Sequence, residues 1–371
     1  MGQRPAYHLL EGHSIRILPR SRLLLRKHAL VLFAAFILTC CLVYHASFSA
    51  GRISIKHNWS LSGTDEIISQ LPSQSPVTII TAFFPLKSKH STSSYNQWLR
   101  NFMTKVSGPM IVYTTRSYAS QIATLRKGFE HLTTVIADFD SIWELPPNRN
   151  YSDIYADQHK MDPEKHHHTP SLYAVWAAKL WMVVQATELN PFNSSYFFWV
   201  DAGSFRDRAH PYRLWPDPFT VDEIWKGGGP ERRKSPIVGL INSWGSLNQF
   251  ENVHESEPDS LLDQTADRIE GGWFGGPIEA ITWWAHEFYR LRDKYAEMGK
   301  FIGKDQLVHN AIALLNPQRV LVLETYKNAN LPTCKLDPWF AFQNYLAHES
   351  ERVRGCPHTP ALSLDEAMGT S

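Results

Sequence analysis

The sequence predicts an α/β fold with a mostly parallel central sheet, and two observations carry this prediction. Short apolar runs alternate with segments of helical periodicity from about residue 77 to residue 345. Among these runs, Tyr196–Val200 (YFFWV) has five apolar residues in succession, which is the pattern of a strand buried on both faces. A segment of about 270 residues is large but acceptable for one α/β domain.

The apolar runs place the strands, and capping signals place the helices. The predicted strands are Val77–Phe84, Pro109–Thr114, Thr133–Asp138, Tyr196–Val200, Pro236–Leu240 and Val320–Glu324. Thr169-Pro170 gives an N-cap and a proline in the first turn of a helix that Asn190-Pro191 ends. A second helix is predicted to begin at Gly276-Pro277 and a third to cover Leu307–Leu315, and residues 346–371 are expected to form a polar, loose tail.

The N-terminal part of the chain predicts a membrane anchor. Residues 1–28 form a basic tail with six Arg or Lys against one acid, and residues 29–51 form an apolar segment. The 24 uncharged residues from His28 to Gly51 would span about 36 Å as a helix, enough for a hydrocarbon core of about 30 Å. Because the basic flank is N-terminal, we expect a single-pass type II protein whose remaining chain is lumenal. A cleaved signal peptide is the alternative.

Beyond the anchor, residues 52–76 are interpreted as a Ser-rich stem and residues 77–345 as the main domain. This part of the chain has 31 basic and 35 acidic residues, a balance that argues against nucleic-acid binding. Cys334 and Cys356 are a candidate disulfide, and Asn58, Asn150 and Asn193 stand in glycosylation sequons. Both features agree with an oxidising secretory lumen.

The run Trp199-Val200-Asp201-Ala202-Gly203 contains the leading site candidate. Ligands of open α/β sheets gather at the carboxyl ends of strands, and Asp201 stands at such an end. Its carboxylate can bind a divalent cation, with Arg206 and Asp207 following closely. The alternative is an Asp that caps the next turn.

Lys179 lies within the apolar stripe of the helix that leads into this strand. A lysine in such a stripe usually extends its ammonium group to solvent. If it points to the same edge of the sheet, it can contact a diphosphate as a point charge. Both interpretations are open from periodicity alone.

The run Glu270–Gly276 (EGGWFGG) places four glycines around two aromatic residues. Glycine allows positive φ and close approach to a ligand, so Gly272 and Gly275 are candidate acceptor contacts, with Trp273 and Phe274 as sugar-stacking rings. Ordinary turns and helix caps also use glycine pairs.

Asp305 precedes the third helix and is either an N-cap or a general base for an acceptor hydroxyl. A run of histidines earlier in the predicted domain is a weaker signal. His166, His167 and His168 are consecutive and cannot all face one ion, so we expect a solvated loop in which His168 is the residue nearest the pocket.

Taken together, these stretches resemble the HtrL/YibB (WlaTC-like) glycosyltransferase family over roughly residues 77–345. The matching features, in the family's order, are Val77–Phe84, Thr169-Pro170 with Trp176 and Lys179, Trp199–Gly203 with Arg206, Gly271–Gly276 and Asp305-Gln306.

The resemblance implies a GT-A-like nucleotide-binding sandwich, a nucleotide-sugar donor, a glycan or glycoconjugate acceptor, and Mn²⁺ or Mg²⁺. It favours Asp201 and Asp305 as catalytic residues, Lys179, Asp201 and Arg206 as donor contacts, and Asp201 with Asp207 as metal ligands. One departure is that Gly203 stands where many GT-A enzymes carry a second Asp.

Two functional hypotheses follow. The first is a type II glycosyltransferase of the Golgi or endoplasmic reticulum membrane, with a hexosyltransferase as the expected subtype. The second is a non-catalytic lumenal module that keeps the fold for binding or scaffolding, for which Gly203 is the main support.

Overall fold

The computed structural model describes residues 76–86, 90–206, 212–226, 228–244, 253–329 and 331–369. The predicted basic tail and anchor, the stem up to residue 75, Asn58 and Asp207 all lie outside these ranges. Among the residues that are described, no helix is both long enough and apolar enough to span a bilayer.

An eight-stranded sheet forms the centre of the described domain, in the order β3-β2-β1-β4-β6-β5-β7-β8. The strands are β1 (Val77–Phe83), β2 (Met110–Thr114), β3 (Thr133–Ile136), β4 (Tyr196–Val200), β5 (Ile237–Leu240), β6 (Ile269–Pro277), β7 (Leu321–Leu323) and β8 (Leu362–Ser363). Of these, β6 and β8 run antiparallel to the others. The predicted α/β class and mostly parallel sheet are therefore confirmed.

Helices cover both faces of this sheet. They are α3 (Thr92–Met103), α4 (Arg116–Leu125), α5 (Ser152–Met161), α6 (Pro170–Leu189), α7 (Pro218–Trp225), α8 (Gly229–Arg232), α9 (Pro258–Leu261), α10 (Ile278–Glu297), α11 (Asp305–Leu315), α12 (Thr325–Ala329), α13 (Ala341–Tyr345) and α14 (Leu364–Gly369). Short 3-10 turns lie at Glu130–Leu132, Ile142–Glu144, Pro146–Asn148 and Glu349–Glu351.

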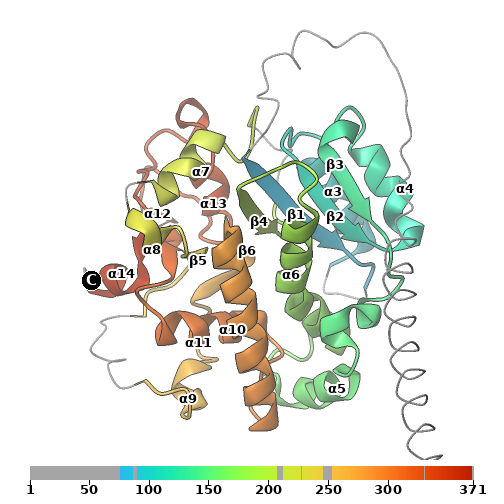
Figure 1. Cartoon of the computed structure of the whole chain (residues 1–371), viewed down its shortest axis with the longest axis vertical. Coiled ribbons are helices and arrows are strands. Elements are labelled where there is room, and N and C mark those ends of the chain that lie inside the picture. Colours follow the sequence, from blue (N-terminus) through green and yellow to red (C-terminus); the bar gives the residue numbers. More distant parts are fainter. Residues whose placement is uncertain are drawn as a thin grey trace, which may run out of the picture. The chain divides into compact units, whose positions relative to one another are not determined.

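Alternation along the strands divides the core into two layers. In β1, Ile80 packs into the layer under α6, α10 and α11, whereas Ile79 packs into the layer under α3, α4 and α7. Figure 1 shows α6 and α10 side by side in front of the sheet. The domain is thus a three-layer α/β/α arrangement, and α6 and α10 cover the central strands.

Helix α6 forms as its capping residues predict. The Thr169 hydroxyl accepts the Leu172 N–H, Pro170 occupies the first turn, and Asn190 ends the helix in the left-handed region with φ 31°. The second predicted helix is also confirmed as α10, and the third as α11, which begins two residues earlier than expected.

Strand β6 is an element that the sequence did not predict. Its glycines were interpreted as turn residues with access to positive φ, but none of Gly271, Gly272, Gly275 and Gly276 has a positive φ. They give space to neighbours instead: a Cβ on Gly275 would lie 2.3 Å from the Phe198 ring of β4. The glycines allow a central strand to pass close to bulky side chains.

The expectation of a loose tail at residues 346–371 is also wrong. Strand β8 pairs with β7, and Leu364, Ala367 and Met368 of α14 are buried in the core. The polar composition of the segment hid a short apolar sequence of about one helical turn, so the domain continues through Gly369.

Candidate active site

Asp201 lies at the carboxyl end of β4, directly after the last strand residue. Its backbone N–H donates to Gly272 O at 2.8 Å, which continues the pairing of β4 with β6. The Trp199 indole Nε1–H donates to Asp201 Oδ1 at 2.7 Å. The side chain is 38% exposed, so the carboxylate is fixed by the strand and still reachable by a ligand.

Lys179 joins Asp201 to a second carboxylate from a distant element. Its Nζ lies 2.9 Å from Asp305 Oδ2 and 3.3 Å from Asp201 Oδ1, and it donates to Gly271 O at 2.8 Å. The ammonium group therefore donates one hydrogen bond to a backbone oxygen and lies within ion-pair distance of both carboxylates. Lys179 of α6 therefore points to the same edge of the sheet as Asp201, which is one of the two interpretations left open by the sequence.

The predicted role of Lys179 needs correction. Its side chain is 3% exposed and its ammonium group is enclosed by Asp201, Asp305 and Gly271 O, so it is poorly placed for direct contact with a diphosphate. Burial lowers the pKa of Lys179, but the charges of Asp201 and Asp305 outweigh burial and the pKa is raised overall. Lys179 is thus a charged cross-link that positions two carboxylates.

Asp305 is the first residue of α11, and Lys304 before it is the N-cap residue. Asp305 Oδ1 accepts the Gln306 N–H at 2.9 Å, and Gln306 Nε2 donates to Ile269 O at 2.8 Å. A Cβ on Gly271 would lie 2.9 Å from Asp305 Oδ1, so glycine is required for this approach. Because the Asp305 side chain is only 4% exposed, it is better placed to position the site than to take a proton from an acceptor.

Glu270 is a site residue that the sequence did not reveal. It begins the glycine run, is 2% exposed, and its Oε2 lies beside the Trp273 indole without a hydrogen bond of good geometry. Burial, reinforced by the charge of Asp201, raises the pKa of Glu270 well above its usual range. Burial raises the pKa of Asp201 too, although Lys179 opposes that shift.

The candidate acceptor residues divide into two groups. Trp273 and Phe274 are 0% and 1% exposed, and the Trp273 ring stacks on Phe342 at 5.0 Å. Neither ring has a face for a sugar, so their expected stacking role is wrong, and Gly275 is likewise packed against Phe198. Gly272 is the member of this set that lies at the site, beside Asp201.

Arg206 lies in the loop after β4, where the sequence placed it. Its guanidinium covers the rings of Trp98 and Phe340 at 4.8 and 5.3 Å, and Nε donates to Gly203 O. The residue is exposed, so it is a cation near the site that a ligand can reach. The structure does not describe its neighbour Asp207.

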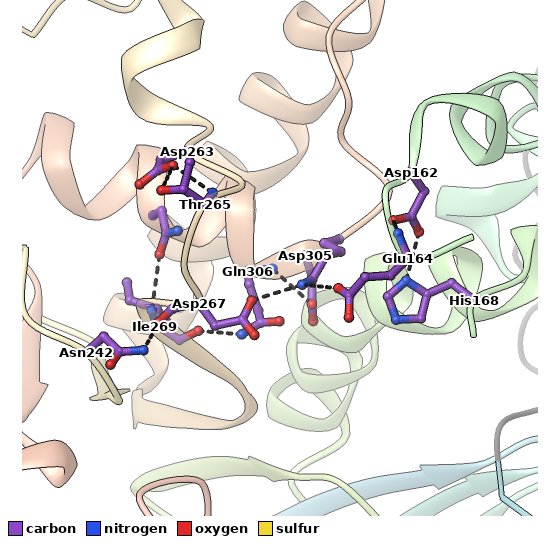
Figure 2. A network of polar contacts seen from close by, with 12 residues as sticks. Asp162, Glu164, His168, Asn242, Asp263, Thr265, Asp267, Ile269, Asp305 and Gln306 are labelled. Carbon is purple, nitrogen blue, oxygen red and sulfur yellow. Dashed lines mark hydrogen bonds and ion pairs between the residues drawn. The ribbon is translucent and has the colours of Figure 1, made fainter. Parts of the chain in front are cut away.

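Lys304 ties the segment before α11 to two other loops. Glu164 and Asp267, both labelled in Figure 2, each lie 2.9 Å from its Nζ. Figure 2 also shows His168 against Asp162, whose Oδ2 lies 2.8 Å from His168 Nδ1. The expected solvated histidine loop is thus held in place, and His168 faces Asp162.

A divalent cation of the kind that the family resemblance implies needs free oxygen ligands. No group of three or more His, Cys, Asp or Glu within the described ranges is arranged to hold a metal. Asp201 Oδ2 accepts no hydrogen bond from the described residues, and the Glu270 carboxyl is close to it. One or two carboxylates, with water and phosphate oxygens, are an ordinary Mg²⁺ or Mn²⁺ environment, so these residues fit such an ion.

Other predicted features lie outside the site that Asp201, Asp305 and Glu270 form with Lys179. Cys334 and Cys356 form a disulfide, as expected. Asn150 and Asn193 are exposed. A hollow of about 560 Å³ that Asn193 helps to line lies before β4, at the edge of the sheet opposite Asp201, and so has no part in this site.

Comparison with protein-family models gives no match, and comparison with curated proteins gives none. Among solved structures, the chain is similar to the apo form of mouse xyloside xylosyltransferase 1, with a TM-score of 0.39 and 11% identity. The match covers 67% of this chain and 84% of the other. The likeness is too slight to carry an argument about function.

Proposed function

We propose that this chain is a glycosyltransferase with a GT-A-like fold that transfers a sugar from a nucleotide-sugar donor to a glycan or glycoconjugate acceptor. One observation carries the proposal: Lys179 holds Asp201 and Asp305 together at the carboxyl end of β4. Open α/β sheets bind their ligands at this edge, and a cluster of buried ionised groups there is typical of a functional site.

Each residue has a role in donor binding that its geometry supports. Asp201 presents Oδ2, which is not used by the described residues, toward the open side of the site. Arg206, exposed and supported by two aromatic rings, is suited to a phosphate group. A Mn²⁺ or Mg²⁺ ion held at Asp201 would neutralise the donor diphosphate.

Lys179 and Asp305 act through Asp201. The ammonium group of Lys179 fixes the orientation of the Asp201 carboxylate and offsets part of the negative charge that would repel a diphosphate. Asp305 forms an ion pair with Lys179 and couples the site to α11. The arrangement is preorganised, because every link is present without a ligand.

The proposal is tested by incubating the purified chain with a panel of nucleotide sugars, with and without Mn²⁺, and measuring hydrolysis and transfer. We expect turnover of at least one donor and a loss of about 100-fold or more in Asp201→Ala. Glu279→Gln, an exposed change on α10, is the matched control and should keep full activity. Full activity in Asp201→Ala would show that the site is elsewhere.

A non-catalytic binding module remains a second candidate because Gly203 stands at the third position after β4 in place of a carboxylate. Such a module would be stabilised against heat by a nucleotide sugar but would not turn it over. Turnover sensitive to Asp201→Ala excludes this candidate.

We also propose that the domain is lumenal, in the Golgi or endoplasmic reticulum, held by the N-terminal anchor. The disulfide between Cys334 and Cys356 and the exposure of Asn150 and Asn193 support this location. Peptide-N-glycosidase treatment of the cell-derived protein should increase its gel mobility. The lumenal location would be contradicted if the mobility stays unchanged and added protease digests the domain in intact microsomes.

A further inference from the structure

We propose that Glu270 supplies, beside Asp201, the second carboxylate that binds the divalent cation. The inference deepens the proposed function and rests on it. Gly203 has no side chain to serve as the second ligand, and Asp207, the other candidate after β4, lies outside the described residues. The structure brings a second acid to Asp201 from a different strand.

A local irregularity in the sheet brings Glu270 to this position. Leu240 of β5 pairs with Ile269 of β6, and Val238 pairs with Phe274. A single residue of β5 therefore lies opposite Glu270–Trp273 of β6, so this part of β6 bulges out of the regular ladder. On its other side the bulge is fixed to Asp201, whose N–H donates to Gly272 O.

The two carboxyl groups face one small space. A Cβ built on Gly272 would lie 2.7 Å from Glu270 Oε1 and 3.7 Å from Asp201 Oδ2. Both oxygens therefore border the volume that the missing side chain leaves free. Gly272 is partly exposed, so solvent and small ions reach this volume.

The bonding of both groups points to a missing ligand. The Glu270 side chain is 2% exposed; its Oε2 lies beside the Trp273 indole without a hydrogen bond of good geometry, while its Oε1 is the oxygen that borders the space at Gly272. A buried carboxyl without such partners is costly. Asp201 uses Oδ1 for Trp199 and Lys179 and leaves Oδ2 free of the described residues.

The charges of the cluster agree with this assignment. Asp201, Asp305 and Glu270 carry three negative charges when ionised, and Lys179 carries one positive charge. One divalent cation would balance the remaining two charges, and its own charge would favour the ionised form of Glu270 that burial alone disfavours. Lys179 lies on the Oδ1 side of Asp201, so it leaves the Oδ2 side for the ion.

The test is the direct binding of Mn²⁺ to the full chain in the absence of donor. Binding is measured as the decrease of the electron paramagnetic resonance signal of free Mn²⁺. We expect Glu270→Gln and Asp201→Asn each to lower the Mn²⁺ affinity about tenfold or more. Glu279→Gln should bind as the unchanged protein does. A Glu270→Gln protein that binds Mn²⁺ with unchanged affinity overturns the inference, and so does an unchanged protein that binds none.

A second variant guards against misfolding. Gly272→Ala places a methyl group in the space between the carboxylates and should also lose Mn²⁺ affinity, while its circular dichroism stays unchanged. If either folded variant binds Mn²⁺ normally, Glu270 is not a ligand.

The result is separable from the proposed function. Loss of Mn²⁺ binding in Glu270→Gln, with no turnover of any donor by the unchanged protein, would support the cation site and contradict the glycosyltransferase. Normal Mn²⁺ binding in Glu270→Gln with Asp201-dependent turnover would do the reverse.

Discussion

At the scale of single residues, Lys179 shows how far periodicity reaches. The stripe of α6 located it, and the helix-to-strand connection indicated the correct edge of the sheet. Its ion-pair partners could not be predicted from local sequence, because Asp305 belongs to a helix more than a hundred residues later in the chain. The predicted direct contact with a diphosphate is disfavoured because Lys179 is buried among these partners.

Replacing Lys179 by Met should destabilise the protein by about 3 to 5 kcal/mol, because it leaves the buried Asp305 carboxylate without its counter-charge. Urea unfolding at pH 7 measures this change. The control is Lys160→Met, which removes an exposed pair with Asp157 and should leave the midpoint almost unchanged. Equal stability of the two variants would mean that Lys179 is not a cross-link.

His309 predicts a pH dependence. It lies on α11, stacked on Trp284, and burial lowers its pKa to about 4 from an ordinary 6.5. Between these values the unfolded chain binds a proton that the folded protein does not, so stability is lost as pH falls from 6.5 toward 4. The contribution is about 1 kcal/mol per pH unit.

Unfolding of the unchanged protein and of His309→Phe at several pH values between 4.5 and 6.5 isolates this contribution. The slope of stability against pH should be shallower in the variant by about one proton. Parallel slopes would show that His309 is protonated equally in both states. Comparing slopes removes any uniform loss of packing in the variant.

Glu270 shows why part of the site was missed. A Glu before two glycines indicates a turn as readily as a strand, and the bulge that turns it toward Asp201 depends on the pairing of β5 with β6. Asp201 was found because its signal is local: a buried strand followed directly by an acid. The missing information is therefore long-range pairing.

At the scale of elements, the contact between α6 and α10 explains how Lys179 is held. The Tyr289 hydroxyl of α10 accepts the Trp181 N–H and donates to Ala177 O. An α-helix would normally join these two backbone groups directly. Tyr289 thus enters the hydrogen-bond ladder of α6 in the turn that contains Lys179.

Tyr289→Phe should destabilise the protein by about 1 to 3 kcal/mol, because it removes a buried hydroxyl that both accepts and donates. The measurements are the midpoint temperature of unfolding and the affinity for the donor, and we expect both to decrease. Tyr196→Phe removes a hydroxyl that donates to Asp222 at the surface and should change little. If the two variants behave alike, the link between α6 and α10 is not a significant constraint.

Several of the elements that were predicted correctly have a strong local signal. Strands β1, β2 and β4 are mostly apolar runs, and α6 has both caps. Strand β6 was missed because its glycines are required by neighbours such as Phe198, which only the fold brings near. Local patterns identified the elements whose own side chains are apolar and buried. They failed for β6, where glycines are needed to make space for side chains of neighbouring strands.

At the scale of the whole molecule, the C-terminal segment completes the sheet. Strand β8 covers the edge of β7, and α14 buries Leu364 and Met368 against the core. Burial of these two side chains contributes about 3 to 6 kcal/mol. The segment is part of the domain even though its composition suggests a tail.

A chain that ends at Pro360 should therefore unfold at a markedly lower urea concentration than the full chain, or aggregate on size-exclusion chromatography, because it exposes the β7 edge. A chain shortened only by residues 370–371 is the control. A truncated protein with unchanged stability would support the original expectation of a loose tail.

The central claim is that the carboxyl edge of β4 binds a nucleotide sugar through Asp201. Isothermal titration calorimetry of the full chain with nucleotide sugars and Mn²⁺ tests it most directly. We predict that at least one donor binds, that Asp201→Asn weakens this binding about tenfold or more, and that Glu279→Gln leaves it unchanged. Donor affinity that is equal in Asp201→Asn, or the absence of binding by every nucleotide sugar, would contradict the account.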